Sequence, residues 1–232
     1  MKTIYFVRHG VARHNVPDPH TGQMPNLYDE KYTDPPLVLQ GELQANELGA
    51  KLREMGLFEK RSTSSTVDAT NLNSKKHIDL VVSSPLTRCL QTSSLIFPDF
   101  SPLVCHGGIR EAYGMHYPDR RSKLSQIKVM FPNVTHYHPS LTEDDVDWQP
   151  HIRETRDDVI RRIDDFFVWL MQQSQESICV VTHGVWVECA LLKYCPRVLE
   201  FGRKRVYNCE TYAAHLTYKG EQLALENVQQ IA

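Results

Sequence analysis

The fold is decided by the stretch Thr3-Ile4-Tyr5-Phe6-Val7-Arg8-His9-Gly10, in which an apolar, β-branched run leads directly into a histidine and a glycine. Such a run is typical of a strand buried on both faces, and the glycine permits a turn where the strand ends. The same pattern recurs in Val180-Val181-Thr182-His183-Gly184. Two such strands side by side would bring their histidines together. We therefore predict a site built around His9 and His183.

Apolar periodicity outside these stretches predicts alternating strands and helices. We expect strands over 3–7, 79–83 and 178–182, and two further strands over 212–216 and 222–225. We expect helices from about 42 to 55, from Pro85 as the first helical position to 96, from 157 to 173 and from 185 to 193. Gly56 and the pair Thr155 and Asp158 are expected to cap two of them. This alternation favours a three-layer α/β/α sandwich with a mainly parallel central sheet.

Length and composition narrow the class of protein. The 232 residues suffice for a sizeable core and show no second domain boundary, so we expect a single domain over 1–232. Residues 61–76 are rich in Ser, Thr, Asn and Lys, which predicts a mobile insertion. The net charge of -2 gives no reason to expect a nucleic-acid partner or an anionic membrane surface. No run resembles a membrane span or a secretory leader, and the cysteines form no C-x-x-C pair, so we expect a cytoplasmic protein.

The side chains around the histidines are of the kind that binds phosphate. Arginine offers bidentate hydrogen bonds to phosphate oxygens and keeps its charge at physiological pH. Arg8 directly precedes His9, and Arg88 lies near the start of the helix expected to end at residue 96, where the helix dipole favours an anion. Asn15 can donate a neutral hydrogen bond to the same group. A nucleophilic histidine among cations can accept a phosphoryl group, which predicts a phosphotransfer enzyme.

The set of motifs resembles the histidine phosphatase superfamily (phosphoglycerate-mutase-like, branch 1), and within it the eukaryotic members of phosphatase type. The motifs that carry this resemblance are Arg8-His9-Gly10 with Asn15, Asp34-Pro35-Pro36-Leu37 to Gly41, Ser84-Pro85 with Arg88 and Gln91-Thr92, Arg110-Glu111, and Thr182-His183-Gly184. The resemblance implies a phosphoglycerate-mutase-like fold and a phosphohistidine on His9, surrounded by Arg8, Arg88 and His183. It also implies that Glu111 donates a proton to the leaving group and then activates water.

Residues 112–150 fall where this family has its variable, substrate-contacting cap. Within this cap segment, Arg120 and Arg121 are candidates to bind a second anionic group of the substrate. His136 and His138 lack a third ligand at a metal-binding spacing. Guanidinium and imidazole groups supply the positive charge that the chemistry needs, so we expect neither a metal nor a cofactor.

The leading hypothesis is a metal-independent phosphatase that hydrolyses a small phosphomonoester through phospho-His9. Two alternatives stay open: a phosphoglycerate mutase, and a non-catalytic regulatory module that binds phosphate. Ala12 stands where many members of the family have Ser or Thr, and Leu37-Val38 stands where they often have Leu-Thr. Because those hydroxyls line the site of the mutases, their loss disfavours the mutase. The sequence leaves the physiological substrate and the oligomeric state open.

Overall fold

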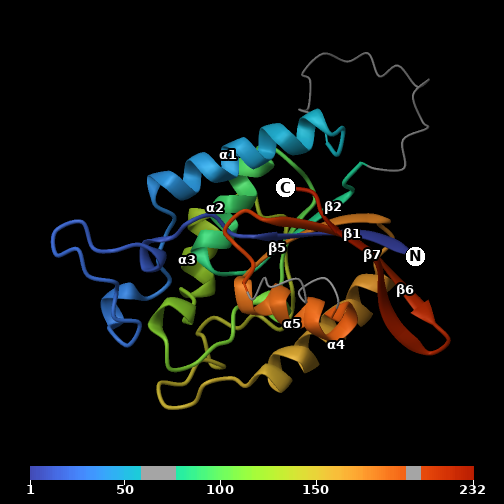
Figure 1. The fold of residues 1–232 in the computed structure, drawn as a ribbon. Helices are drawn as coiled ribbons and strands as arrows, with labels where there is room; N and C mark the ends of the chain where they lie inside the picture. The colour runs from blue at the N-terminus through green and yellow to red at the C-terminus, as the bar shows by residue number, and fades with distance from the viewer. Residues whose placement is uncertain (59–76, 197–204) are drawn as a thin grey trace.

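A seven-stranded sheet forms the centre of the molecule in a computed structural model that describes residues 1–58, 77–196 and 205–232 (Figure 1). The strand order is β4-β3-β2-β5-β1-β6-β7. The strands are β1 (Lys2–Arg8), β2 (Leu80–Ser83), β3 (Leu103–Cys105), β4 (His136–Tyr137), β5 (Ser177–Thr182), β6 (Thr211–Lys219) and β7 (Gln222–Gln230). Strands β1 to β5 pair in parallel, whereas β6 and β7 add to β1 as an antiparallel hairpin. The predicted, mainly parallel sheet is confirmed.

Helices cover both faces of this sheet, which confirms the three-layer sandwich (Figure 1). On one face lie α1 (Leu39–Glu54), α2 (Thr87–Ile96) and α3 (Leu124–Met130), and on the other lie α4 (Arg156–Gln172) and α5 (Gly184–Tyr194). Each central strand contributes side chains to the core on both faces of the sheet, because successive side chains point to opposite faces. In β1, Tyr5 and Val7 pack toward α1 and α2, while Ile4 and Phe6 pack toward α4 and α5. The central strands are therefore apolar at nearly every position.

Two helix caps are confirmed, and one predicted helix start is wrong. Gly56 has a φ of 69° just after α1, and Thr155 exchanges hydrogen bonds with Asp158 at the start of α4. We predicted Pro85 as the first residue of its helix, but α2 begins at Thr87 because Leu86 has an extended backbone. The cap comes from elsewhere in the chain: an oxygen of Asp34 accepts the Thr87 backbone N–H at 2.8 Å.

The remaining described segments are loops with short helical turns. The long loop of residues 10–36 carries the 3₁₀ turns η1 (Arg13–Asn15) and η2 (Glu30–Tyr32), and β3 is followed by η3 (Gly107–Ile109). The cap segment holds η4 (Tyr117–Asp119), α3 and β4. The insertion predicted over 61–76 lies outside the described residues.

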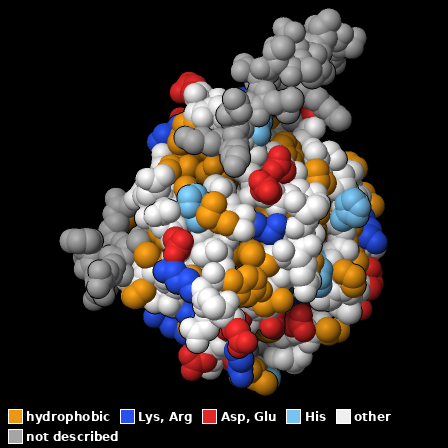
Figure 2. Space-filling view, turned by 90° about the vertical axis from the view of Figure 1, so that its right-hand side faces the viewer, with side chains coloured by type: hydrophobic (Ala, Val, Ile, Leu, Met, Phe, Trp, Pro, Cys, Tyr) orange, Lys and Arg blue, Asp and Glu red, His pale blue; other side chains and the backbone are white. Residues whose placement is uncertain are grey.

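The surface is mixed in charge and polarity. On the face shown in Figure 2, Lys and Arg side chains are scattered among acidic and hydrophobic ones and form no continuous basic area within the described residues. In the part of the chain that the structure describes, we find no helix with both the length and the apolar character needed to cross a membrane.

Candidate active site

Parallel pairing of β1 with β5 brings the two histidines together. Arg8 lies opposite Thr182 in the register, and the His9 backbone N–H donates to the Thr182 carbonyl at 3.0 Å. Each histidine leaves its strand one residue later at the same edge of the sheet. Their ring centroids lie 5.1 Å apart, and both side chains are buried. The predicted meeting of His9 and His183 is therefore what the structure shows.

Hydrogen bonds fix which nitrogen of His9 carries the proton. Its Nδ1 lies 2.7 Å from the Gly10 carbonyl oxygen, and because a carbonyl only accepts, Nδ1 must donate. Nε2 then presents its lone pair, which accepts from Nε of Arg88 at 3.2 Å. Burial first, and the charges of Arg88 and Arg8 second, hold the pKa of His9 well below its usual value. His9 is thus a neutral imidazole whose Nε2 is available as a nucleophile.

The two predicted arginines flank His9 in different ways. Arg88 is fully buried at the start of α2, where its Nη1 donates to the Pro118 carbonyl at 2.6 Å and its Nη2 pairs with Asp119 at 3.0 Å. Arg8 donates from Nη1 to the Val206 carbonyl at 2.5 Å. Its Nε is buried and has no hydrogen-bond partner among the described residues. A buried guanidinium N–H without an acceptor is costly, so this donor is suited to an anion that arrives from solution.

His183 sits directly before α5, with its Nε2 2.8 Å from the hydroxyl oxygen of Ser84 and 3.3 Å from the sulfur of Cys89. Burial and then the charge of Arg88 lower the pKa of His183 well below its usual value. Ser84 belongs to the turn between β2 and α2, so a neighbouring strand orients this imidazole. His183 is therefore a second neutral imidazole, held in place beside His9.

Glu111 follows η3 and is held by the start of α5. The Ala112 backbone N–H donates to Oε1 at 2.9 Å, and the Val185 N–H donates to Oε2 at 3.3 Å. Burial and the nearby charge of Asp119 raise the pKa of Glu111 to about 6. Arg88 opposes this rise. Burial lowers the pKa of Arg8, and the charge of Glu111 opposes that lowering, so the carboxyl group interacts electrostatically with both arginines. A carboxyl group with such a pKa can give and take a proton near neutral pH.

The three predicted substrate-binding residues occupy different environments. The Oδ1 of Asn15 accepts the Ala12 backbone N–H at 3.0 Å, which leaves its amide N–H groups as donors. Arg120 is partly exposed, with its guanidinium 5.2 Å from the centre of the Trp148 ring and 3.6 Å from Glu30.

Arg121, the second residue of the basic pair, lies in a different environment from Arg120. Its side chain is buried, and its guanidinium donates to the carbonyls of Ser122, Thr142, Glu143 and Asp144. Four carbonyls therefore take up its terminal donors. These contacts hold residues 142–144, and a role of Arg121 in binding substrate stays a prediction.

Two further residues lie at or near the site, and the sequence did not predict their contacts. His14 has its ring centroid 6.1 Å from that of His9, and its buried Nδ1 has no partner among the described residues. Burial, Arg88 and Arg8 lower the pKa of His14 to about 2. Asp34 is buried and accepts hydrogen bonds from both Thr87 and Ser122, so one carboxylate joins the long loop, α2 and the cap segment. In the sequence, Asp34 belongs to the Asp34-Pro35-Pro36-Leu37 motif and is one of the acids near the matched segments, but nothing predicts these contacts, and no spacing singles out His14.

The neutral histidines predict acid sensitivity. Because the folded-state pKa values of His9, His14 and His183 lie below the unfolded value, the unfolded chain binds protons that the folded chain excludes below about pH 6.5. The free energy of unfolding should therefore decrease as the pH is lowered below about 6.5, by up to about 1.4 kcal/mol per pH unit for each histidine. The pKa of Glu111 is raised to about 6, so between about pH 6 and 4.5 the folded chain binds a proton there that the unfolded chain does not. This one proton partly offsets the loss of stability caused by the histidines. Urea unfolding at pH 7, 6 and 5 measures the slope.

The variant His14→Gln isolates one of these contributions. It should make the pH dependence shallower by up to about 1.4 kcal/mol per unit below pH 6.5. His136→Gln is the matched control because His136 is exposed on β4 and should leave the slope as in the wild type. An unchanged slope for His14→Gln would contradict a neutral His14 in the folded chain.

Comparisons with known proteins place this arrangement in a family. The profile of the histidine phosphatase superfamily (branch 1) matches residues 69–229. The match includes Arg88, Glu111 and His183, whereas Arg8 and His9 precede it. Phosphoglycerate mutase-like protein 1 of Arabidopsis thaliana is 29% identical over 212 residues, which cover 79% of this chain and 68% of that protein.

Solved structures share the fold at low sequence identity. A mycobacterial glucosyl-3-phosphoglycerate phosphatase superposes with a TM-score of 0.56 at 17% identity, covering 97% of both chains. A phosphoserine phosphatase from Entamoeba histolytica in complex with 3-phosphoglyceric acid gives a TM-score of 0.54 at 16% identity, covering 99% of this chain and 97% of that one. At this identity the likeness establishes the fold alone. In the described part of the chain, no three His, Cys, Asp or Glu side chains form a group that could hold a metal ion.

Proposed function

This chain belongs to the histidine phosphatase superfamily (branch 1), and we propose that it hydrolyses a small phosphomonoester through a covalent intermediate on His9. The observation that carries the proposal is the buried Arg8 Nε, which has no acceptor among the described residues, together with a neutral His9 whose Nε2 lone pair accepts the Arg88 Nε–H at 3.2 Å. A phosphoryl oxygen that takes over this N–H releases the lone pair for attack. A phosphate monoester supplies both the missing acceptor and the electrophile. The guanidinium groups of Arg8 and Arg88 offset its negative charge.

The first step transfers the phosphoryl group to the enzyme. The Nε2 lone pair of His9 forms a bond to phosphorus while the bond between phosphorus and the ester oxygen breaks. The proton of the Glu111 carboxyl goes to the departing alkoxide, which leaves as an alcohol. The Nδ1–H of His9, held by the Gly10 carbonyl, keeps the attacking nitrogen facing the substrate and carries part of the positive charge that develops on the ring. Arg8, Arg88 and His183 surround the transferring oxygens.

The second step returns the site to its starting state. A water oxygen attacks phosphorus and gives its proton to the Glu111 carboxylate, while the phosphorus–Nε2 bond breaks and inorganic phosphate leaves. His9 regains its lone pair and Glu111 regains its proton. The same carboxyl group thus serves as acid and then as base, a role suited to a pKa of about 6.

Product analysis tests the proposed function against its two alternatives. The purified chain should release inorganic phosphate from p-nitrophenyl phosphate and from members of a panel of sugar phosphates, nucleotides and phosphorylated acids. Incubation with 3-phosphoglycerate distinguishes a phosphatase, which yields free phosphate, from a mutase, which yields 2-phosphoglycerate. Binding of phosphate esters without turnover of any of them would contradict the proposal and favour a binding module.

A further inference from the structure

Asp119, at the end of η4, is a buried carboxylate of the cap segment that reaches the His9 site. Its Oδ1 lies 3.0 Å from Nη2 of Arg88, and its Oδ2 lies 2.7 Å from Nη1 of Arg153. The Asp119 backbone N–H donates to the His116 carbonyl at 3.1 Å, which holds the turn closed. Both oxygens are therefore engaged, and this carboxylate is a fixed part of the structure rather than a mobile charge.

The first consequence concerns the orientation of Arg88. A guanidinium group is planar and rigid, so fixing both terminal nitrogens fixes the direction of its Nε–H. The cap segment supplies both partners: the Pro118 carbonyl for Nη1 and Asp119 for Nη2. The Nε–H then points at Nε2 of His9, 3.2 Å away. The same hydrogen bond marks the place where a phosphoryl oxygen would meet Arg88.

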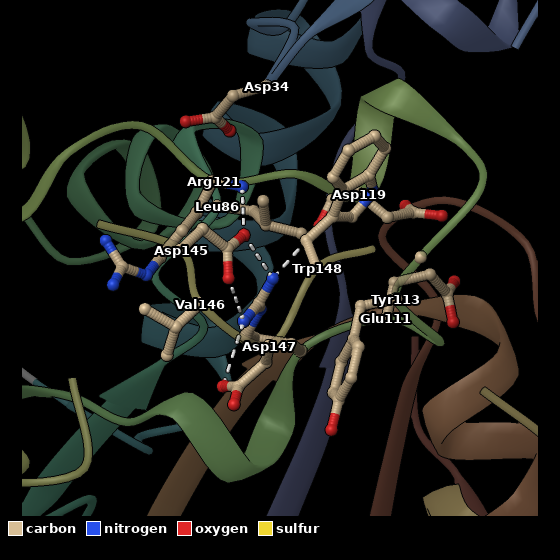
Figure 3. A network of polar contacts seen from close by, with 12 residues as sticks. Asp34, Leu86, Glu111, Tyr113, Asp119, Arg121, Asp145, Val146, Asp147 and Trp148 are labelled. Carbon is tan, nitrogen blue, oxygen red and sulfur yellow. Dashed lines mark hydrogen bonds and ion pairs between the residues drawn. The ribbon is translucent and has the colours of Figure 1, made fainter. Parts of the chain in front are cut away.

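The second consequence concerns the proton of Glu111. Figure 3 shows the carboxylates of Asp119 and Glu111 directed to the same side of the polar network, and the charge of Asp119 raises the pKa of Glu111. Two kinds of group favour the ionised carboxylate of Glu111 and so oppose the rise in its pKa. They are the guanidinium groups of Arg88 and Arg8, and the backbone N–H groups of Ala112 and Val185. Arg162 donates to the Glu111 backbone carbonyl. Burial is the larger cause of the raised pKa of Glu111, and the charge of Asp119 adds to it against these cations and donors.

We propose that Asp119 is a positioning residue of this reaction, which fixes the Arg88 guanidinium against His9 and places a negative charge on the same side of the site as Glu111. The proposal rests on the phosphatase function proposed above. It assigns the cap segment a part in catalysis in addition to any contact with substrate. It also joins two separate requirements of the first step, the cation at the phosphoryl group and the proton for the leaving group, through one side chain.

The test compares Asp119→Asn with the wild type on two substrates over a range of pH. p-Nitrophenyl phosphate has a good leaving group and needs little help from an acid, whereas glycerol 3-phosphate has a poor one and depends on the Glu111 proton. The wild-type rate on glycerol 3-phosphate should fall as the pH rises through the pKa of Glu111. In Asp119→Asn this descending limb should move to lower pH by roughly one unit, because a neighbouring negative charge is gone.

The same variant should also show the loss of Arg88 positioning. At the pH where Glu111 is protonated in both proteins, kcat/KM for p-nitrophenyl phosphate should be about tenfold lower in Asp119→Asn, since a misdirected donor stabilises the transition state less. Asp119→Glu, which retains the charge, should restore the position of the descending limb. Glu111→Gln should lack that limb on glycerol 3-phosphate.

Asp145→Asn is the matched control for damage to the cap segment. Asp145 forms the other buried pair of this segment, 2.6 Å from Nη2 of Arg110, and accepts the Arg121 backbone N–H (Figure 3). Its loss should lower stability but leave the descending limb in place. A limb at the wild-type pH in Asp119→Asn, or an equal shift in Asp145→Asn, would overturn the inference. If the wild type releases no phosphate from any substrate, the proposed function itself fails, so the two failures are distinguishable.

Discussion

His9→Ala should lower kcat/KM for p-nitrophenyl phosphate by at least about 10³-fold, because the substitution removes the atom that bonds to phosphorus in the proposed mechanism. The wild-type enzyme, quenched during turnover, should carry an acid-labile phosphate that His9→Ala lacks. Mass spectrometry of the quenched protein at neutral or alkaline pH measures this modification. Together the two results identify His9 as the residue that receives the phosphoryl group.

Two controls test whether the loss of activity is specific to the His9 imidazole. His136→Ala replaces an exposed histidine on β4 and should retain wild-type turnover and the phosphoenzyme. His9→Ala should still bind vanadate, since Arg8 and Arg88 remain and their charges do not depend on the imidazole. If His9→Ala turns over at the wild-type rate or forms the same phosphoenzyme, the nucleophile is another residue and the proposed mechanism is wrong.

Arg88→Ala should damage both activity and stability. Loss of the guanidinium removes the donor that faces His9 Nε2, and kcat/KM should fall by about 10²- to 10³-fold. The substitution also leaves the buried Asp119 carboxylate with Arg153 as its remaining ion-pair partner within 3 Å. Breaking one side of a buried pair is costly, so the free energy of unfolding should fall by about 3 kcal/mol. Steady-state kinetics and urea unfolding measure the two effects separately.

Arg161→Ala provides the comparison for Arg88. Arg161 is an exposed arginine on α4 that pairs with Asp158, and exposed ion pairs contribute little to stability. This variant should keep its activity and nearly all of its stability. If Arg88→Ala were as stable and as active as Arg161→Ala, the buried pair of Arg88 with Asp119 would contribute neither to stability nor to catalysis, and the prediction would be wrong.

Local sequence patterns were enough to predict that the two histidines meet and that Arg88 lies at the start of a helix. The apolar runs before His9 and His183 are long enough to be recognised as buried strands, and parallel strands of one sheet end at one edge. The meeting of the two histidines follows from these two facts. Arg88 could be placed because it lies in the first turn of a helix that directly follows a strand. Each of these inferences uses residues within about ten positions of one another, where periodicity and capping rules apply.

The contacts of the cap segment could not be predicted in this way. Arg121 looks like an exposed basic residue in sequence, yet the carbonyls that bury it lie about twenty residues further along in an irregular segment. Pro85 failed as a helix start because the cap of α2 comes from Asp34, which is distant in sequence. Asp119 carries no signature, since a single aspartate in a loop is ordinarily solvated. Such pairings depend on the tertiary fold and have no local pattern.

The pairing of β1 with β5 also sets when the site can exist during synthesis. Residues 2–8 leave the ribosome well before their parallel partner, residues 177–182, which lies far along the chain. Pairings between distant segments form late because the intervening chain must first be closed into a loop. A nascent chain that ends before His183 therefore holds His9 without its neighbouring strand. The proposed site can therefore form only after β5 has been made, so no fragment that lacks β5 should carry activity.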